Sequence, residues 1–161
     1  MPTYFGHFQR WGAPPEKHII EVEGHPLTLW EKRPDQPRAA VLLLHGRTWS
    51  SIPDYVLQVP GENLSLMENL ADAGLAAYAL DLRGYGATPR DDEGWISPRR
   101  AAADVAAVLD WISENAGTDF PPLVLGWSQG ASVGWFCEQL FPGRTLALIL
   151  YGFSLNPCNP K

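Results

Sequence analysis

The 161-residue chain carries 12 Lys and Arg against 18 Asp and Glu, a formal net charge of −6, and is 45% hydrophobic and 19% charged. This size and composition predict a single globular domain and exclude disordered and fibrous proteins. The acidic balance argues against a nucleic-acid partner, and the longest apolar runs are too short to span a bilayer. With no signal-peptide pattern at the start and only two cysteines, the sequence favours a cytoplasmic protein.

The first part of the chain predicts an irregular lead-in and then a hairpin. Residues 1–17 contain several prolines and glycines, so we expect regular structure to begin with a single domain over residues 18–161. Alternating apolar residues predict two strands, over 18–23 and 27–31, joined by a turn at residues 24–25.

The rest of the chain alternates between apolar strands and amphipathic helices. Residues 39–44 (AAVLLL) are apolar on both faces, which is typical of a central parallel strand covered by helices on each side. Further buried strands are predicted over residues 75–82, 122–127 and 145–151, and helices over residues 64–72, between Pro98 and Gly117, and over residues 129–140. This alternation predicts an α/β fold, a mostly parallel sheet with flanking helices.

Ser128 lies in the run Gly126-Trp127-Ser128-Gln129-Gly130, between a predicted strand and a predicted helix. In a G-x-S-x-G turn the serine adopts a strained conformation that lifts its hydroxyl above the sheet, while the glycines let the helix pack against the strand. The alternative is an ordinary glycine-rich turn whose serine only caps the helix. The strand before the motif and the helix after it favour a nucleophile.

Three features in this order resemble the serine-hydrolase branch of the α/β-hydrolase superfamily, which contains esterases and lipases: His45-Gly46, the run DLRGYG at residues 81–86, and the Ser128 turn. The resemblance covers residues 18–155. It implies the α/β-hydrolase fold and a serine-dependent acyl hydrolase, acting on a small carboxylester through an acyl-Ser128 intermediate. No metal-ligand spacing, phosphate loop or dinucleotide motif is present, so we expect no metal and no cofactor.

The resemblance also implies roles for individual residues. The backbone N–H groups of Gln129 and Arg47 would donate to the developing oxyanion. His45 would shape this turn and would not act as the general base, and Asp81 and Arg83 would brace the loop after the second central strand. The residues expected to shape the two turns are His45, Gly46, Gly126 and Gly130.

A serine nucleophile also needs a general base and a carboxylate that orients it. In the family these follow the serine in the order acid, then histidine. After Ser128 the sequence offers only Glu138, which lies within the predicted helix, and no histidine. About six of the family's eight strands can be placed, and the strand at residues 145–151 would form an apolar open edge. We therefore expect an α/β-hydrolase core truncated after about its sixth strand, with the acid and base supplied by other sequence.

Other functions remain open at this stage. Acyltransferases, thioesterases and carbon–carbon bond hydrolases share the same constellation, whereas the dehalogenase and epoxide-hydrolase branches use an aspartate where this chain has Ser128. A non-catalytic alternative is a truncated chain, or a subunit that pairs through residues 145–151 with a complementary chain or with itself. The long connection over residues 47–63 is expected to cover or shape the acyl pocket.

Overall fold

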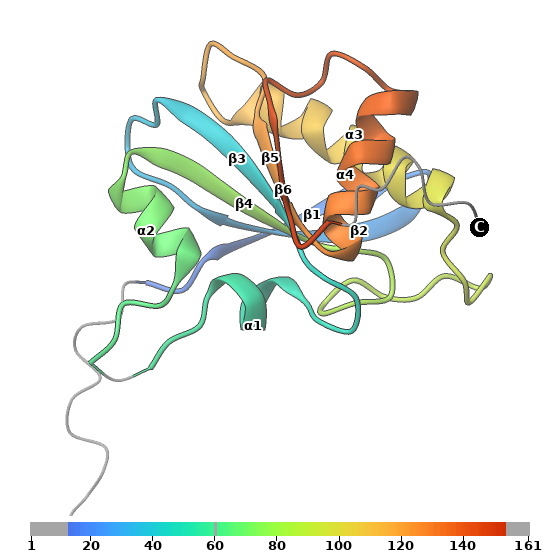
Figure 1. Ribbon diagram of the computed structural model, residues 1–161, viewed down its shortest axis with the longest axis horizontal. Coiled ribbons are helices and arrows are strands. Elements are labelled where there is room, and N and C mark those ends of the chain that lie inside the picture. Colours follow the sequence, from blue (N-terminus) through green and yellow to red (C-terminus); the bar gives the residue numbers. More distant parts are fainter. Residues whose placement is uncertain (1–12, 60, 154–161) are drawn as a thin grey trace, which may run out of the picture.

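The computed structural model describes residues 13–59 and 61–153, which form one six-stranded sheet flanked by helices (Figure 1). The strands are β1 (Glu16–Val22), β2 (His25–Lys32), β3 (Ala39–Leu44), β4 (Leu75–Asp81), β5 (Leu123–Trp127) and β6 (Leu148–Tyr151). The helices are α1 (Ser51–Tyr55), α2 (Leu66–Asp72), α3 (Pro98–Asn115) and α4 (Gln129–Leu140). The strand order is β1-β2-β4-β3-β5-β6. Strands β4, β3, β5 and β6 run parallel, and the β1–β2 hairpin joins them antiparallel through β2, so the predicted mostly parallel sheet is confirmed.

The hairpin starts earlier than the sequence pattern indicated. Strand β1 begins at Glu16, and the turn lies at Glu23 and Gly24, which both have positive φ (51° and 77°). Such a turn matches the right-handed twist of the flanking strands. Residues 1–12 of the expected lead-in lie outside the described residues.

The two central strands, β3 and β4, are apolar up to Asp81 at the end of β4, because helices cover both of their faces. In β3, Leu42 and Leu44 belong to the larger buried cluster beneath α3 and α4. The intervening Val41 and Leu43 belong to a smaller cluster with residues of α1 and α2, on the opposite side of the sheet (Figure 1). Successive side chains of a strand point to opposite faces, so this double covering explains the AAVLLL pattern.

Helix α3 has the boundaries that its end residues predict. The Ser97 side chain accepts a hydrogen bond from the backbone N–H of Arg100, and Pro98 occupies the first helical position. Gly117, with φ of 66°, follows the C-cap residue. Within the described residues, neither this helix nor any other is both long and apolar enough to cross a membrane.

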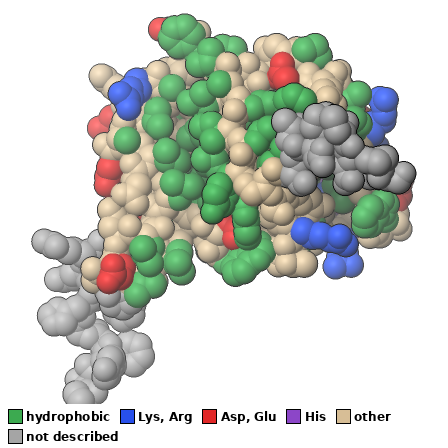
Figure 2. All heavy atoms as spheres, viewed as in Figure 1, with side chains coloured by type: hydrophobic (Ala, Val, Ile, Leu, Met, Phe, Trp, Pro, Cys, Tyr) green, Lys and Arg blue, Asp and Glu red, His purple; other side chains and the backbone are tan. Residues whose placement is uncertain are grey.

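The last strand differs from its prediction. Strand β6 covers only Leu148–Tyr151, and in the described part of the chain it pairs with β5 alone. Its side chains are not all buried: Ile149 is 48% and Tyr151 69% exposed. The reason is that α1 and α2 pack against β2, β3 and β4, so this face of β6 lies beyond the part of the sheet that they cover. Figure 2 shows hydrophobic side chains gathered on the side of the molecule where β6 runs in Figure 1.

The connection over residues 47–63 contains a short helix that its sequence did not indicate. Helix α1 places Tyr55, which is almost fully buried, in the smaller cluster, and the side chain of Ser65 accepts a hydrogen bond from the N–H of Glu68 at the start of α2. Tyr55 therefore anchors the middle of this segment to the smaller cluster, and the capped start of α2 follows it. The role of the segment in covering an acyl pocket stays a prediction.

Two Arg–Asp pairs, one buried and one exposed, allow their contributions to the free energy of unfolding to be compared. Arg83 donates two hydrogen bonds to Asp104 (2.9 and 2.7 Å), and their side chains are 6% and 1% exposed. Arg144 donates to Asp110 at 2.9 Å, with side chains 35% and 55% exposed. We expect Asp104→Asn to lower the free energy of unfolding by about 3 kcal/mol, because it removes the closer and more buried of the two carboxylates that pair with the Arg83 guanidinium and leaves only Asp91, at 3.5 Å. Asp110→Asn should cost less than about 1 kcal/mol. Urea unfolding measures both, and equal losses would contradict this assignment.

Candidate active site

The turn between β5 and α4 holds Ser128 in a strained and accessible position. Its backbone has φ of 53° and ψ of −110°, a region that non-glycine residues rarely adopt. Ser128 occupies the N-cap position of α4, but its side chain accepts no capping hydrogen bond and the residue is exposed. The hydroxyl is therefore free of the capping role that the alternative interpretation requires. Strain of this kind costs about 1–3 kcal/mol and clusters at functional sites.

The two outer glycines of the motif allow the helix to approach the sheet. A Cβ on Gly130 would lie 2.1 Å from the carbonyl oxygen of Leu44 and 2.7 Å from that of His45. A Cβ on Gly126 would lie 2.6 Å from the Cα of Ala131. Real Cβ atoms essentially never come so close to backbone atoms, so only glycine fits at either position.

A second turn meets the Ser128 turn at the same edge of the sheet. Strands β3 and β5 are parallel neighbours with Leu44 opposite Gly126, so the turns that follow them lie side by side. Gly46 packs directly on Trp127, since a Cβ there would lie 2.7 Å from the indole ring. The next residue, Arg47, and Gln129 line the same cleft, which has a volume of about 440 Å³.

The backbone N–H groups of Arg47 and Gln129 donate no hydrogen bond within the described residues. Gln129 is the first residue of α4, where a helix leaves its N–H groups without internal partners. The family resemblance implies that both groups serve as oxyanion donors. The structure brings together the two turns that carry them, and their role as donors stays a prediction.

His45 is fully buried and both of its ring nitrogens are engaged. Nε2 accepts a hydrogen bond from the backbone N–H of Leu82 (3.1 Å), and Nδ1 lies 2.8 Å from the carbonyl oxygen of Gly46. Nδ1 therefore carries the proton, and the ring is neutral. Burial also lowers the pKa of His45 below its ordinary value. With its lone pair occupied, this histidine is placed to hold the turn and not to receive the proton of Ser128.

Asp81 joins three segments at this edge of the sheet. Its buried carboxylate accepts hydrogen bonds from the backbone N–H of Ser51 (2.8 Å), the indole N–H of Trp30 (2.9 Å) and the backbone N–H of Ala87 (2.9 Å). Gly86 is needed beside it, because a Cβ there would lie 2.3 Å from the carboxylate. The carboxylate thus braces the loop after β4, as expected, and also the start of α1, which the sequence did not indicate.

The remaining histidines of the described residues lie away from Ser128. Nε2 of His18 lies 2.6 Å from a carboxylate oxygen of Glu31, and Nε2 of His25 lies 3.1 Å from the carbonyl oxygen of Pro89. Glu138, the one carboxylate after Ser128, accepts hydrogen bonds from the N–H of Gly143 and the hydroxyl of Thr145. No described histidine or carboxylate forms a hydrogen bond with the hydroxyl of Ser128.

Cys137 packs in the core and has no role at this edge. It is almost fully buried in the larger cluster, and burial raises the pKa of its thiol to about 12. The thiol therefore stays protonated and unreactive at neutral pH.

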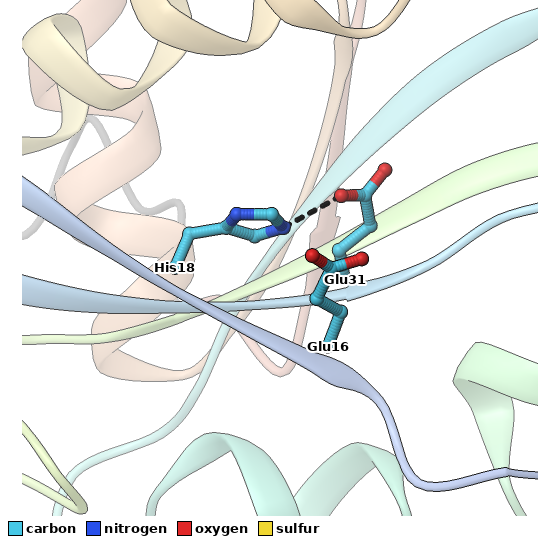
Figure 3. A group of neighbouring side chains, drawn as sticks. All are labelled: Glu16, His18 and Glu31. Atoms are coloured by element: carbon cyan, nitrogen blue, oxygen red, sulfur yellow. Dashed lines mark hydrogen bonds and ion pairs between the residues drawn. The ribbon is translucent and has the colours of Figure 1, made fainter.

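A separate group of side chains on the β1–β2 hairpin could geometrically hold a metal ion. Ligand atoms of Glu16, His18 and Glu31 all lie within 4.8 Å of one another (Figure 3). Glu31 already has protein partners, however: His18 Nε2 lies 2.6 Å from one carboxylate oxygen, and the other accepts from the hydroxyl of Tyr78 (2.9 Å) and from Arg33 (3.3 Å). The Arg33 guanidinium opposes a cation here, so the group is best described as a structural ion-pair network.

Comparison with known proteins agrees with this geometry. The sequence profile of the alpha/beta hydrolase family matches residues 41–157. The chain belongs to the α/β-hydrolase family, and the expected fold class is confirmed.

Three relatives illustrate the range of the family. A monoacylglycerol lipase of Mycolicibacterium smegmatis is 28% identical over 126 residues, which are 74% of this chain and 39% of that protein. A laboratory-evolved variant of potato epoxide hydrolase matches with 26% identity and a TM-score of 0.74, over 92% of this chain and 43% of that one. An epoxide hydrolase of Vigna radiata matches with 25% identity and a TM-score of 0.71, over the same shares. The chain thus spans less than half the length of these relatives.

Two glycines of α4 provide a matched test of the close approach between helix and sheet. We expect Gly130→Ala to lower the free energy of unfolding by about 3 kcal/mol or more, because its methyl group would overlap backbone atoms of β3 that cannot move aside. Gly134→Ala, one turn later, would only contact the side chains of Val124 (3.2 Å) and Leu44 (3.4 Å), and should change stability by about 1 kcal/mol at most. Thermal unfolding compares the two, and an unchanged Tm for Gly130→Ala would rule out the close approach.

The lowered pKa of His45 predicts a specific loss of stability in acid. As the pH falls below the ordinary value of 6.5, the unfolded chain takes up a proton at this residue before the folded chain does. Above pH 6.5 the neutral His45 therefore makes its full contribution to the free energy of unfolding. Below that pH the contribution falls by up to about 1.4 kcal/mol per pH unit, until the lower pKa of the folded state is reached. Unfolding measured between about pH 8 and pH 5 should show a steeper decline for the wild type than for His45→Gln. Parallel curves would contradict a buried neutral His45.

Proposed function

We propose that the chain carries the nucleophile and the oxyanion site of a serine-dependent acyl hydrolase that cleaves small carboxylesters in the cytoplasm. The observation that carries the proposal is the strained, exposed Ser128 at the start of α4, beside two backbone N–H groups without partners in the described residues. Membership of a hydrolase family and a relative named monoacylglycerol lipase support ester chemistry.

In the proposed reaction the Oγ of Ser128 attacks the ester carbonyl carbon, while the hydroxyl proton passes to a general base. The carbonyl oxygen becomes an oxyanion that accepts hydrogen bonds from the N–H groups of Gln129 and Arg47, and loss of one such donor typically costs about 3 kcal/mol of transition-state stabilisation. The intermediate then expels the alcohol, which takes the proton. Water hydrolyses the acyl-Ser128 ester, releasing the acid and restoring the serine.

The proposal places the base and its orienting carboxylate outside these 161 residues. The Nε2 of His45 accepts a hydrogen bond from the N–H of Leu82, and the carboxylate of Glu138 accepts hydrogen bonds from the turn after α4. Neither group is therefore free to take the proton. No histidine follows Ser128 in the sequence. The activity is therefore proposed for this chain together with the segment or partner that supplies those groups.

The residue at the nucleophile position favours ester over epoxide chemistry. Several structural relatives are epoxide hydrolases, a branch in which the resemblance implies an aspartate at this position, whereas this chain has Ser128. Acyltransferases, thioesterases and carbon–carbon bond hydrolases remain alternatives, since they use the same serine and differ in the acceptor or in the bond cleaved.

The free edge of β6 favours a second, non-catalytic candidate. In the described residues only one side of β6 is paired, and Ile149 and Tyr151 leave apolar surface exposed beside it. Such an edge is a template for strand pairing. In this alternative the chain is a subunit that pairs through this strand with a complementary chain or with a second copy, and Ser128 is not acylated.

Labelling with a fluorophosphonate probe tests the proposal against this alternative. We expect the purified chain to form a covalent adduct, slowly because the general base is missing, and Ser128→Ala to abolish it. Ser113→Ala is the matched control: this exposed serine of α3 donates only to the carbonyl oxygen of Leu109 in its own helix, so its removal should leave labelling unchanged. Intact-protein mass spectrometry measures the adduct. A wild-type chain that labels no faster than Ser128→Ala would contradict a competent nucleophile and favour the non-catalytic subunit.

A further inference from the structure

The cleft beside Ser128 is unusually basic for a chain with a net charge of −6. Three arginines line its volume of about 440 Å³, Arg47 after β3 and Arg83 and Arg90 after β4, together with one acidic residue, Asp91. A cleft of this size suits a small-molecule ligand. Because the positive charges in the cleft repel each other, a negatively charged group bound among them would be stabilised.

Within residues 13–59 and 61–153, only one of these three arginines has an acidic partner. Arg83 pairs with Asp104 at 2.7 Å and with Asp91 at 3.5 Å, so both nearby acids belong to it. Arg47 and Arg90 form no ion pair in the described part of the chain. Two guanidinium groups therefore line the cleft without a negative partner among the residues that the structure describes.

Arg90 projects from a loop that is firmly tied to the sheet. The N–H of Gly84 donates to the carbonyl oxygen of Pro89 (3.0 Å), which closes the loop. The hydroxyl of Thr88 donates to the carbonyl oxygen of Asp81 (2.7 Å) and accepts from the N–H of Thr28 (2.8 Å). The stem of Arg90 packs over Gly84, where a Cβ would lie 3.0 Å from its Cγ. Because the backbone that carries Arg90 is held in place, less conformational entropy is lost when its side chain binds a ligand.

An apolar hollow adjoins the basic cleft at the first turn of α4. This hollow, of about 180 Å³, shares Trp95, Ile96 and Gln129 with the cleft and is completed by side chains that include Val133 and Phe136. The side-chain oxygen of Gln129 is buried without a hydrogen-bond partner in the described residues, on the boundary between the two spaces. The surface next to Ser128 thus offers apolar contact on one side and uncompensated positive charge on the other.

From this arrangement we propose that the ester substrate carries a carboxylate, which binds in the cleft to the guanidinium groups of Arg90 and Arg47. The proposal deepens the proposed function and rests on it. The guanidinium fork matches a planar carboxylate with two parallel N–H···O hydrogen bonds. The positive end of α4 adds to the attraction, since the cleft lies at the N-terminus of this helix. The substrate would be a half-ester of a dicarboxylic acid, with its hydrocarbon part against Trp95 and Ile96.

Binding of the expected product class tests the proposal without requiring catalysis. Isothermal titration of the full chain with glutarate should show binding about tenfold tighter than with glutaramide, which has the same length and no charge. Arg90→Gln should weaken glutarate binding about tenfold, whereas Arg90→Lys should retain part of it. The matched control is Arg99→Gln, which removes the same charge from an exposed arginine that lines a different hollow. Added salt should weaken glutarate binding only.

The outcomes separate this inference from the proposed function. Equal binding of glutarate and glutaramide, or an Arg90→Gln variant that binds glutarate like Arg99→Gln, would overturn the carboxylate site even if Ser128 labels normally. Tighter binding of inorganic phosphate than of glutarate would overturn the carboxylate assignment in favour of a phosphate group. Glutarate binding that persists in Ser128→Ala supports the site, and a failure of fluorophosphonate labelling alongside it would count against the proposed function alone.

Discussion

The close approach of the first turn of α4 to the carbonyl end of β3 is the constraint on which the site depends. Gly130 lies so near the carbonyl oxygens of Leu44 and His45 that no side chain fits between them. This contact fixes the Ser128 turn against the turn that carries Arg47, because β3 and β5 are parallel neighbours. Strand β3 also pairs with β4, so the Asp81 loop is positioned from the same strand. One strand therefore sets the relative positions of all three loops at this edge of the sheet.

Much of this architecture was predictable from local patterns. The doubly apolar β3 and β4, the cap at Ser97 and the bounds of α4 follow from side-chain periodicity and end residues, which act over a few positions. The errors concern long-range relations. The sequence of β6 reads as buried, yet its exposure depends on whether α1 and α2 reach beneath it, and they do not.

The candidate site shows the same difference between local patterns, which are predictable, and long-range contacts, which are not. The motifs around His45 and Ser128 identify two turns, since their glycines and serine act within five residues of one another. The three donors to Asp81 come from β2, from the start of α1 and from the loop after β4, and no local pattern connects them. Arg90 likewise belongs to no motif. Its candidate role appears only when the fold pairs Asp91 and Asp104 with Arg83 and leaves Arg90 without an ion pair in the described part of the chain.

The sheet topology also fixes the order in which this edge can form. The β1–β2 hairpin closes across a two-residue turn, whereas β3 and β5 pair across about 80 residues, and the entropy cost of closing a loop grows with its length. The contacts that hold Ser128 at its positive φ come from α4 packed on β3, so they exist only after that distant pairing is made. Before then we expect the turn to adopt an unstrained conformation, because nothing compensates the cost of the positive φ. We therefore expect the strained geometry of Ser128, which sets it apart from an ordinary serine, to be acquired late in folding.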